Sequence, residues 1–184
     1  MRPTDILIKE HDAIKVMLRI LESACHKLES GENVDAKHLL LMVEFIREFA
    51  DRCHHGKEED LLFPAMQEAG IPKEGGPIGV MLHEHEQGRA FVKSLGEGIA
   101  RYTADDKESV AGIIENARGY FNLLSHHIFK EDNVLFPMAA KLIPEGIQAR
   151  LIDEFEKVEI EKIGRGRHEQ LHRILESLKA IYLK

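Results

Sequence analysis

The sequence has little of what exported, membrane-spanning or nucleic-acid-binding proteins require. Its 184 residues include two cysteines, Cys25 and Cys53, which are too few for a disulfide scaffold and indicate a reducing compartment. No apolar run approaches the roughly 18 residues of a membrane helix, and no apolar leader follows Met1. The net charge of −7 argues against general nucleic-acid binding, which needs a basic face. We therefore expect a cytoplasmic protein with no membrane or nucleic-acid partner.

Tryptophan is also absent and tyrosine occurs three times, whereas histidine occurs 11 times. The hydrophobic share of 43% and the charged share of 31% are typical of a globular protein. A chain of this length is expected to form one domain with a large core. Because histidine binds metals and titrates near neutral pH, its excess indicates a metal site or a pH-linked role.

Hydrophobic residues recur at helical spacing along nearly the whole chain, and no sustained alternation predicts a strand. The pattern predicts four long helices, which end before Gly31, near Ala69, near Arg101 and near Leu142. Pro64 is expected to end or bend the second helix, and Asp105 or Asp106 to begin the fourth. Short loops make neighbouring helices antiparallel, so the sequence predicts an all-α fold.

The expected architecture is an up-down four-helix bundle over residues 1–143. Residues 144–184 carry apolar residues at helical spacing and are interrupted around Gly164-Arg165-Gly166. We expect them to form a C-terminal helical extension of the same domain, packed on the bundle.

Two stretches of the chain, 73 residues apart, are nearly the same. Each begins with a histidine, has a glutamate four residues later and ends in Leu-Phe-Pro; they run over 54–64 and 127–137. A Glu-His dipeptide precedes each stretch, Glu10-His11 in one case and Glu84-His85 in the other. This internal duplication supplies two imidazoles and one carboxylate per half, which is what a paired metal site needs.

Residues four apart in a helix project from one face, so each repeat places a histidine beside its glutamate. The histidine can bind one metal ion while the glutamate reaches across to bridge two. The predicted ligands are His11, His54, Glu58, His85, His127 and Glu131. This nitrogen-rich set suits iron, manganese or zinc rather than calcium. Two carboxylates neutralise half the charge of two divalent ions, which leaves the rest to an oxide or hydroxide bridge and to open positions.

These motifs resemble those of haemerythrin-like proteins, a family of four-helix cation-binding domains with His and Glu ligands. The resemblance covers residues 5–142 and rests on both Glu-His dipeptides and both His-xxx-Glu repeats with their Leu-Phe-Pro endings. It implies a non-haem di-iron centre inside the bundle. By this resemblance His11 and His54 hold one iron, His85 and His127 hold the other, and Glu58 and Glu131 bridge them.

The chain departs from the oxygen-carrying members of that family at one position. Those proteins have a second histidine one turn before the ligand of the third helix, and Met81 stands there in this sequence. They also use a His-to-Asp spacing of five in the last helix, which His127 and Asp132 would fit, but alignment with the first half selects Glu131. The chain therefore resembles the bacterial and regulatory branches linked to oxygen, nitric oxide, peroxide or iron handling.

For several neighbours of the predicted ligands, a place outside the metal site is favoured over direct binding of the metal. Glu59 and Asp132 follow the bridging glutamates and could accept hydrogen bonds from ligand imidazoles of adjacent helices. His55 and His126 lie about 100° round the helix from ligand positions, which favours a solvent-facing or outer role over ligation. His83 has the same status.

The segment His168-Glu169-Gln170-Leu171-His172 spells the HExxH pattern of zinc proteases, in which two histidines bind zinc and the glutamate activates water. That mechanism needs a third ligand downstream, and only twelve residues follow. An ordinary amphipathic helix is favoured, and a zinc hydrolase is the remote alternative. A further alternative is that the extension offers His168 to the metal position left open by Met81.

The leading hypothesis is a cytoplasmic di-iron protein that binds or reacts with oxygen, nitric oxide or peroxide. The second is an iron store, iron donor, or iron or redox sensor that acts through a protein partner. In that case the C-terminal helix would move about Gly164 and Gly166. The residues leave open whether the protein is an enzyme and which protein is its partner.

Overall fold

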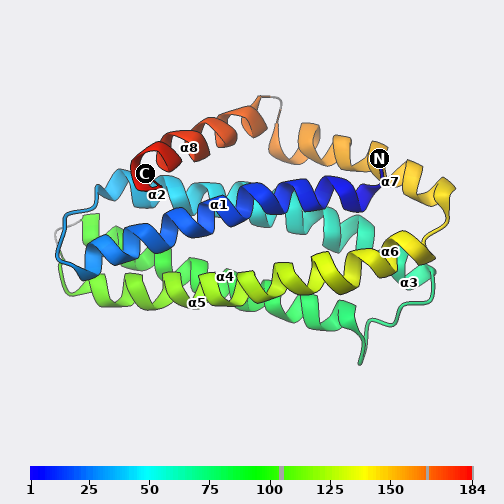
Figure 1. Ribbon diagram of the computed structural model, residues 1–184, viewed down its shortest axis with the longest axis horizontal. Helices are drawn as coiled ribbons and strands as arrows, with labels where there is room; N and C mark the ends of the chain where they lie inside the picture. The colour runs from blue at the N-terminus through cyan, green and yellow to red at the C-terminus, as the bar shows by residue number, and fades with distance from the viewer. Residues whose placement is uncertain (104–105, 165, 184) are drawn as a thin grey trace.

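The structure, a computed structural model, describes residues 1–103, 106–164 and 166–183 and is helical in nearly all of them (Figure 1). The first bundle helix is α1 (Pro3–Glu29), and the third is α4 (Pro77–Thr103). The second runs through α2 (Ala36–Phe45), η1 (Ile46–His55), η2 (Glu58–Leu62) and α3 (Phe63–Glu68), where η marks a wider, π-helical stretch. The fourth runs through α5 (Ser109–Lys130), η3 (Glu131–Leu135) and α6 (Phe136–Leu142). The predicted all-α bundle is confirmed.

The start of the fourth helix lies later than the sequence suggests. Asp105 is outside the described residues, and Asp106 accepts a hydrogen bond from the backbone nitrogen of Glu108 at 3.0 Å. The helix begins at Ser109. Asp106 therefore stabilises the turn before the helix and is not the residue at which the helix begins.

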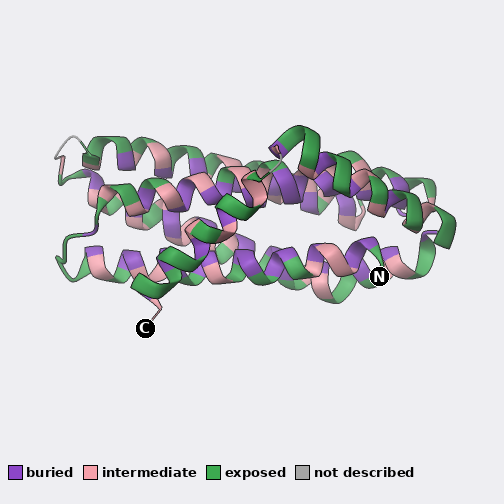
Figure 2. Ribbon diagram, turned by 90° about the horizontal axis from the view of Figure 1, so that it is seen from above, coloured by how far each residue is buried: buried purple, intermediate pink, exposed green. Residues whose placement is uncertain are grey.

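Each bundle helix packs against those before and after it in the chain, and α1 also packs against α5 to close the square. The buried residues face the bundle interior (Figure 2). They form two apolar clusters, one toward each end of the bundle. Along α1, Leu7 belongs to one cluster and Ile14 to the other, which leaves His11 between them.

Both Leu-Phe-Pro repeats coincide with π-helical turns. The turns end at Leu62 and Leu135, so Pro64 and Pro137 stand at the start of the next α-helical stretch. Proline lacks an N–H and clashes with the carbonyl four residues earlier, and a wider turn relieves both problems. The second helix consequently does not end at Pro64 but continues to Glu68.

The C-terminal extension consists of α7 (Glu145–Val158), η4 (Glu159–Ile163) and α8 (Arg167–Tyr182). It lies against the first and second bundle helices, where α8 packs on α1 and α2 and η4 packs on η1 (Figure 1). The break between η4 and α8 has positive φ angles of 102° at Gly164 and 79° at Gly166, which glycine tolerates best. Arg165, part of the predicted interruption, is outside the described residues.

Candidate metal centre

The six predicted ligands come together in the middle of the bundle, between the two apolar clusters. Each is at most 1% exposed. They come from six stretches of the chain: His11 from α1, His54 from η1, Glu58 from η2, His85 from α4, His127 from α5 and Glu131 from η3. We refer to these six residues as the His/Glu cluster.

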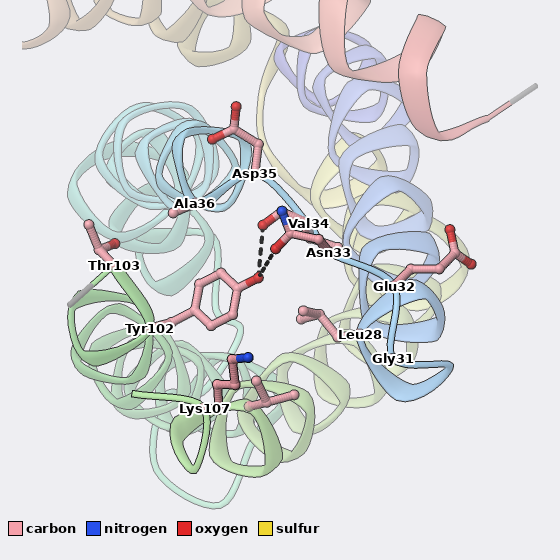
Figure 3. Close-up of a pocket in the computed structure, with 11 residues that line it drawn as sticks. Leu28, Gly31, Glu32, Asn33, Val34, Asp35, Ala36, Tyr102, Thr103 and Lys107 are labelled. Carbon is pink, nitrogen blue, oxygen red and sulfur yellow. Dashed lines mark hydrogen bonds between the residues drawn. The ribbon is translucent and has the colours of Figure 1, made fainter. Parts of the chain in front are cut away.

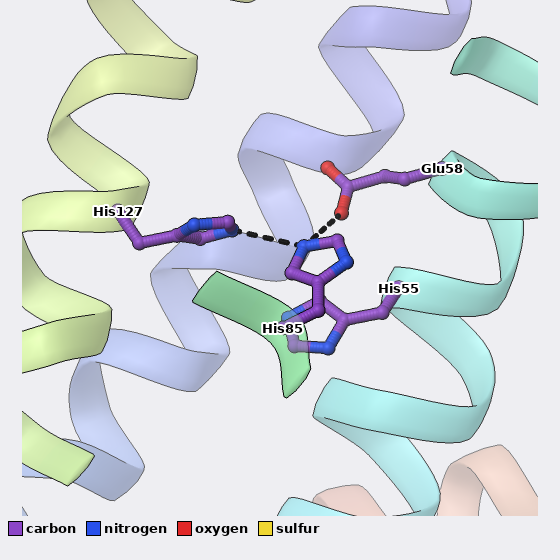
Figure 4. A group of neighbouring side chains, drawn as sticks. All are labelled: His55, Glu58, His85 and His127. Atoms are coloured by element: carbon purple, nitrogen blue, oxygen red, sulfur yellow. Dashed lines mark hydrogen bonds and ion pairs between the residues drawn. The ribbon is translucent and has the colours of Figure 1, made fainter. Parts of the chain in front are cut away.

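The donor atoms fall into two groups in which all atoms lie within 4.8 Å of one another. One group contains His11, His54, Glu58 and Glu131. The other contains His55, Glu58, His85 and His127 (Figure 4). Glu58 belongs to both groups. The arrangement is that of two adjacent sites with one shared carboxylate.

Glu131 belongs to the first group alone, but like Glu58 it lies close to histidines of both groups. The Glu58 oxygens lie 3.5 Å from His54 Nε2 and 3.5 Å from His85 Nε2. Those of Glu131 lie 3.2 Å from His11 Nε2 and 3.2 Å from His127 Nε2. Each carboxylate therefore has one oxygen beside a histidine of each pair, which is the placement that the predicted bridging role requires.

Despite these short contacts, most inward-facing atoms make no hydrogen bond with the described part of the chain. The unpartnered atoms are His11 Nε2, His54 Nε2 and both carboxylate oxygens of Glu58 and Glu131. Buried polar atoms normally have hydrogen-bond partners, and buried carboxylates without a cation are costly. The residues present fit a pair of metal ions.

The outward-facing Nδ1 atom of each histidine meets a carboxylate. These distances are 2.6 Å for His11 to Asp132, 2.8 Å for His54 to Glu10, 2.7 Å for His85 to Glu59 and 2.8 Å for His127 to Glu84. An ionised carboxylate accepts the ring N–H, which directs the Nε2 lone pair inward. Glu59 and Asp132 occupy the outer positions that the sequence suggests for them.

The partners of two of these acids keep them ionised. Burial works against the charged form of Glu59, but the hydrogen bonds from His85 and Arg89 lower its pKa. Burial likewise opposes ionisation of Asp132, and His11 and Lys15 lower the pKa of that carboxyl. Both side chains therefore act as hydrogen-bond acceptors at neutral pH.

His85 and His127 face each other through their Nε2 atoms, 3.1 Å apart (Figure 4). Because both Nδ1 atoms donate to carboxylates, a single proton fits between the two Nε2 atoms. A metal ion held by these two imidazoles would take the place of that proton.

Protons balance the charges of the metal-free cluster. Burial raises the pKa of Glu58 well above its usual range, and the neighbouring Glu131 adds to the effect. Burial also opposes ionisation of Glu131, but His127 and His11 hold its pKa well below the usual range. Although burial disfavours a charged imidazole, Glu131 and Glu84 raise the pKa of His127 to about 9. Metal binding would displace these protons.

His55 does not lie where α-helical geometry places it. It is 4% exposed, and its ring stacks on His85 with 3.8 Å between centroids. Of the solvent-facing and outer roles that the sequence favours for His55, the solvent-facing one is wrong, because η1 is π-helical and its wider turn rotates consecutive residues by less than 100°. His83 and His126 lie in regular α-helices and are exposed, as expected.

His168 belongs to neither group of the cluster. Its neighbours among metal-binding residue types are Glu10 and Glu159, between which the Lys57 amine already lies at 2.5 Å from each carboxylate. Met81, whose place in the third helix suggested an open metal position for His168, is itself buried in an apolar cluster.

The side chains of the HExxH segment are not arranged as in a zinc protease site. The rings of His168 and His172 pack on Phe49. The Glu169 side chain is 79% exposed and lies 3.8 Å from Arg173. No candidate metal group within the described ranges contains His172. The segment is an amphipathic surface helix.

The sequence patterns did not predict the carboxylates that hold His54 and His127, or the lysines that pair with those carboxylates. Glu10 and Glu84 hold ligand histidines, and each also pairs with a lysine, Lys57 or Lys130. These four residues occupy equivalent positions in the duplicated halves. The repeat itself was the signal that could have identified them.

Two cavities lie at different distances from the cluster. A cavity of about 650 Å³ at the far end of the bundle is lined by Leu28 and Tyr102, whose hydroxyl donates to Val34 O at 3.0 Å (Figure 3). It is roughly 25 Å along α1 from His11. A cavity of about 250 Å³ instead reaches His55 and His85. The smaller cavity is the one adjacent to the cluster.

Within the described ranges, no helix has the length and apolar character needed to cross a membrane. No solved structure gives a significant match to the chain. An uncharacterized protein of Mycobacterium tuberculosis is 24% identical over 159 residues, which cover 86% of this chain and 61% of that protein.

The iron-sulfur cluster repair protein YtfE of Musicola paradisiaca is 36% identical over 92 residues, and that of Dickeya chrysanthemi is 34% identical over 93. These matches cover 48% of this chain and 40% and 41% of the repair proteins, so the chain spans less than half of their length. Residues 2–139 match the family described as the hemerythrin HHE cation binding domain. With this match over most of its length and with its helical bundle, the chain belongs to the hemerythrin HHE cation-binding family.

Proposed function

We propose that the His/Glu cluster holds two iron ions and that this centre binds or reacts with a small ligand such as oxygen, nitric oxide or peroxide. One ion would be held by His11 and His54, the other by His85 and His127, with Glu58 and Glu131 between them. The observation that carries the proposal is the set of buried, inward-facing donor atoms without hydrogen-bond partners in the described structure. Such atoms are stabilised by a cation and are costly without one.

The donor chemistry supports iron, manganese or zinc, and the names of the repair relatives favour iron among these. When bound, ferrous iron supplies electrons and open coordination positions for a small ligand. The protein's own part is to orient the donors and exclude water. Glu59 and Asp132 orient two imidazoles, while Phe63 and Phe136 stack on His85 and His11 with centroids 6.0 and 5.4 Å apart.

Metal content tests the first part of the proposal. After anaerobic loading with Fe²⁺, the wild-type protein is expected to retain two ions per chain. The double variant Glu58→Gln, Glu131→Gln removes both bridging charges and is expected to lose both ions. The matched control replaces two exposed histidines, His83→Gln and His126→Gln, and should retain two. Fewer than two ions in the wild type, or equal loss in the control, would contradict the proposal.

Rapid mixing tests the second part. The anaerobic ferrous protein is mixed separately with oxygen, nitric oxide and peroxide, and the optical spectrum is followed. A spectral change with at least one ligand is expected, and it should be absent in the Glu58→Gln, Glu131→Gln variant. No change with any of the three ligands would remove the reactive role and leave metal binding alone.

A second candidate function is iron storage, iron donation, or sensing through a partner. The observation that favours it is Lys57, whose amine joins Glu10 of the cluster's outer layer to Glu159 of the extension. A change in the position of His54 on metal binding would therefore be passed through Glu10 and Lys57 to the C-terminal extension. Limited proteolysis of the metal-free and iron-loaded proteins should then differ at the break between η4 and α8. Identical cleavage patterns would count against this candidate.

A further inference from the structure

The second group of donor atoms contains a histidine that the duplication does not explain. His55 has no counterpart in the second half, where the equivalent residue is Ile128. Ile128 is buried in an apolar cluster. His55, in contrast, presents one ring nitrogen within 4.8 Å of the donor atoms of Glu58, His85 and His127.

We propose that His55 is a third imidazole ligand of the ion held by His85 and His127. This inference rests on the proposed metal-binding function. It gives that ion a nitrogen donor which the other ion lacks, because the residue equivalent to His55 in the second half is Ile128. It also places the extra donor on the second helix, on a π-helical turn, and not at Met81 of the third helix.

Like the four predicted histidine ligands, His55 has a carboxylate at its Nδ1 atom, although at a longer distance. Its Nδ1 lies 3.3 Å from a carboxylate oxygen of Asp51. Arg89 donates to Asp51 at 2.9 Å and to Glu59, the partner of His85, at 2.6 Å. One guanidinium group thus fixes the acceptors of both imidazoles. With its proton on Nδ1, His55 has a free Nε2 lone pair.

The stacked ring of His55 needs one movement before it can bind. Its plane is 15° from that of His85, and the nitrogen lone pairs of an imidazole lie in the ring plane, so the lone pairs of the two rings lie in nearly parallel planes. A shared ion requires them to converge, which a turn of the His55 ring about its side-chain bonds would achieve. The 250 Å³ cavity borders His55 together with Gly88 and Tyr120 and provides space for that turn. Metal binding is therefore expected to separate the stacked rings.

The test compares the wild type with His55→Ile, which copies the second half, and with the matched control His126→Ile, an exposed histidine. Fe²⁺ is titrated anaerobically into each protein. His55→Ile is expected to bind one ion as tightly as the wild type and the other more weakly, by more than the roughly 10- to 100-fold that loss of an outer hydrogen-bond partner costs. The control should match the wild type. Equal affinities of wild type and His55→Ile for both ions would overturn the assignment.

A measurement on the wild type avoids dependence on the folding of the variant. With ¹⁵N-labelled histidine and Zn²⁺ as a diamagnetic probe, the Nε2 resonance of His55 is expected to shift on binding along with that of His85. A shift of His85 without one of His55 would overturn the assignment and leave the proposed function intact. If the wild type binds neither Zn²⁺ nor Fe²⁺, the proposed function fails, and this inference fails with it.

Discussion

The two halves of the bundle are nearly equivalent around the His/Glu cluster and differ just outside it. Each half holds a histidine of the other half in place: Glu59 accepts from His85, and Asp132 accepts from His11. The phenylalanines follow the same rule, because Phe63 stacks on His85 and Phe136 on His11. Each half therefore depends on the other to hold one of its cluster histidines in place.

The outer layer breaks the symmetry at one pair of lysines. Lys57 is completely buried and pairs with Glu10 and Glu159, with its amine 5.7 Å from the centre of the Phe155 ring. Lys130, its equivalent, pairs with Glu84, and its side chain is 38% exposed. The difference arises because the C-terminal extension packs on the second bundle helix and covers Lys57. The duplication therefore sets the cluster, and the extension makes its two sides unequal.

Removing the two lysines should expose this inequality most strongly. In the metal-free protein, Lys57→Met leaves two carboxylates without their buried cation and is expected to lower the free energy of unfolding by about 3–5 kcal/mol. Lys130→Met breaks a partly solvated pair and is expected to cost less than about 1 kcal/mol. Urea unfolding of both variants measures the difference. Equal losses would show that the extension does not make the two sides energetically unequal.

The sequence predicted the bundle because apolar spacing and loops report directly on helices. It also identified the six cluster residues, since a duplicated His-xxx-Glu pattern marks positions that meet when two equivalent halves pack together. Burial of Lys57 was not predictable from these patterns, because it depends on the cover provided by Phe155 and Glu159, about 100 residues away in the sequence. The position of His55 was missed because local spacing assumes an α-helical turn, and η1 is π-helical.

The outer carboxylates should affect opposite ions. Glu59→Gln weakens the support of His85, and Asp132→Asn weakens that of His11, so each variant is expected to lower the affinity for the ion held by the opposite half. An effect of about 10- to 100-fold is expected in each case. Anaerobic Fe²⁺ titration gives the two affinities, and the spectra show which ion is weakened. If both variants weaken the same ion, the exchange of partners between halves has no energetic role.

The smallest expected effect concerns the two phenylalanines. Phe63 and Phe136 are each 1% exposed and belong to the same apolar cluster. Leucine keeps most of the apolar volume, so Phe63→Leu and Phe136→Leu should each lower the free energy of unfolding of the metal-free protein by about 1–1.5 kcal/mol. The two values should agree within about 0.5 kcal/mol, because the C-terminal extension makes the surroundings of Lys57 and Lys130 unequal and leaves those of the two phenylalanines alike. Urea unfolding measures both, and a clearly larger loss for Phe63→Leu would mean that the asymmetry reaches the inner layer as well.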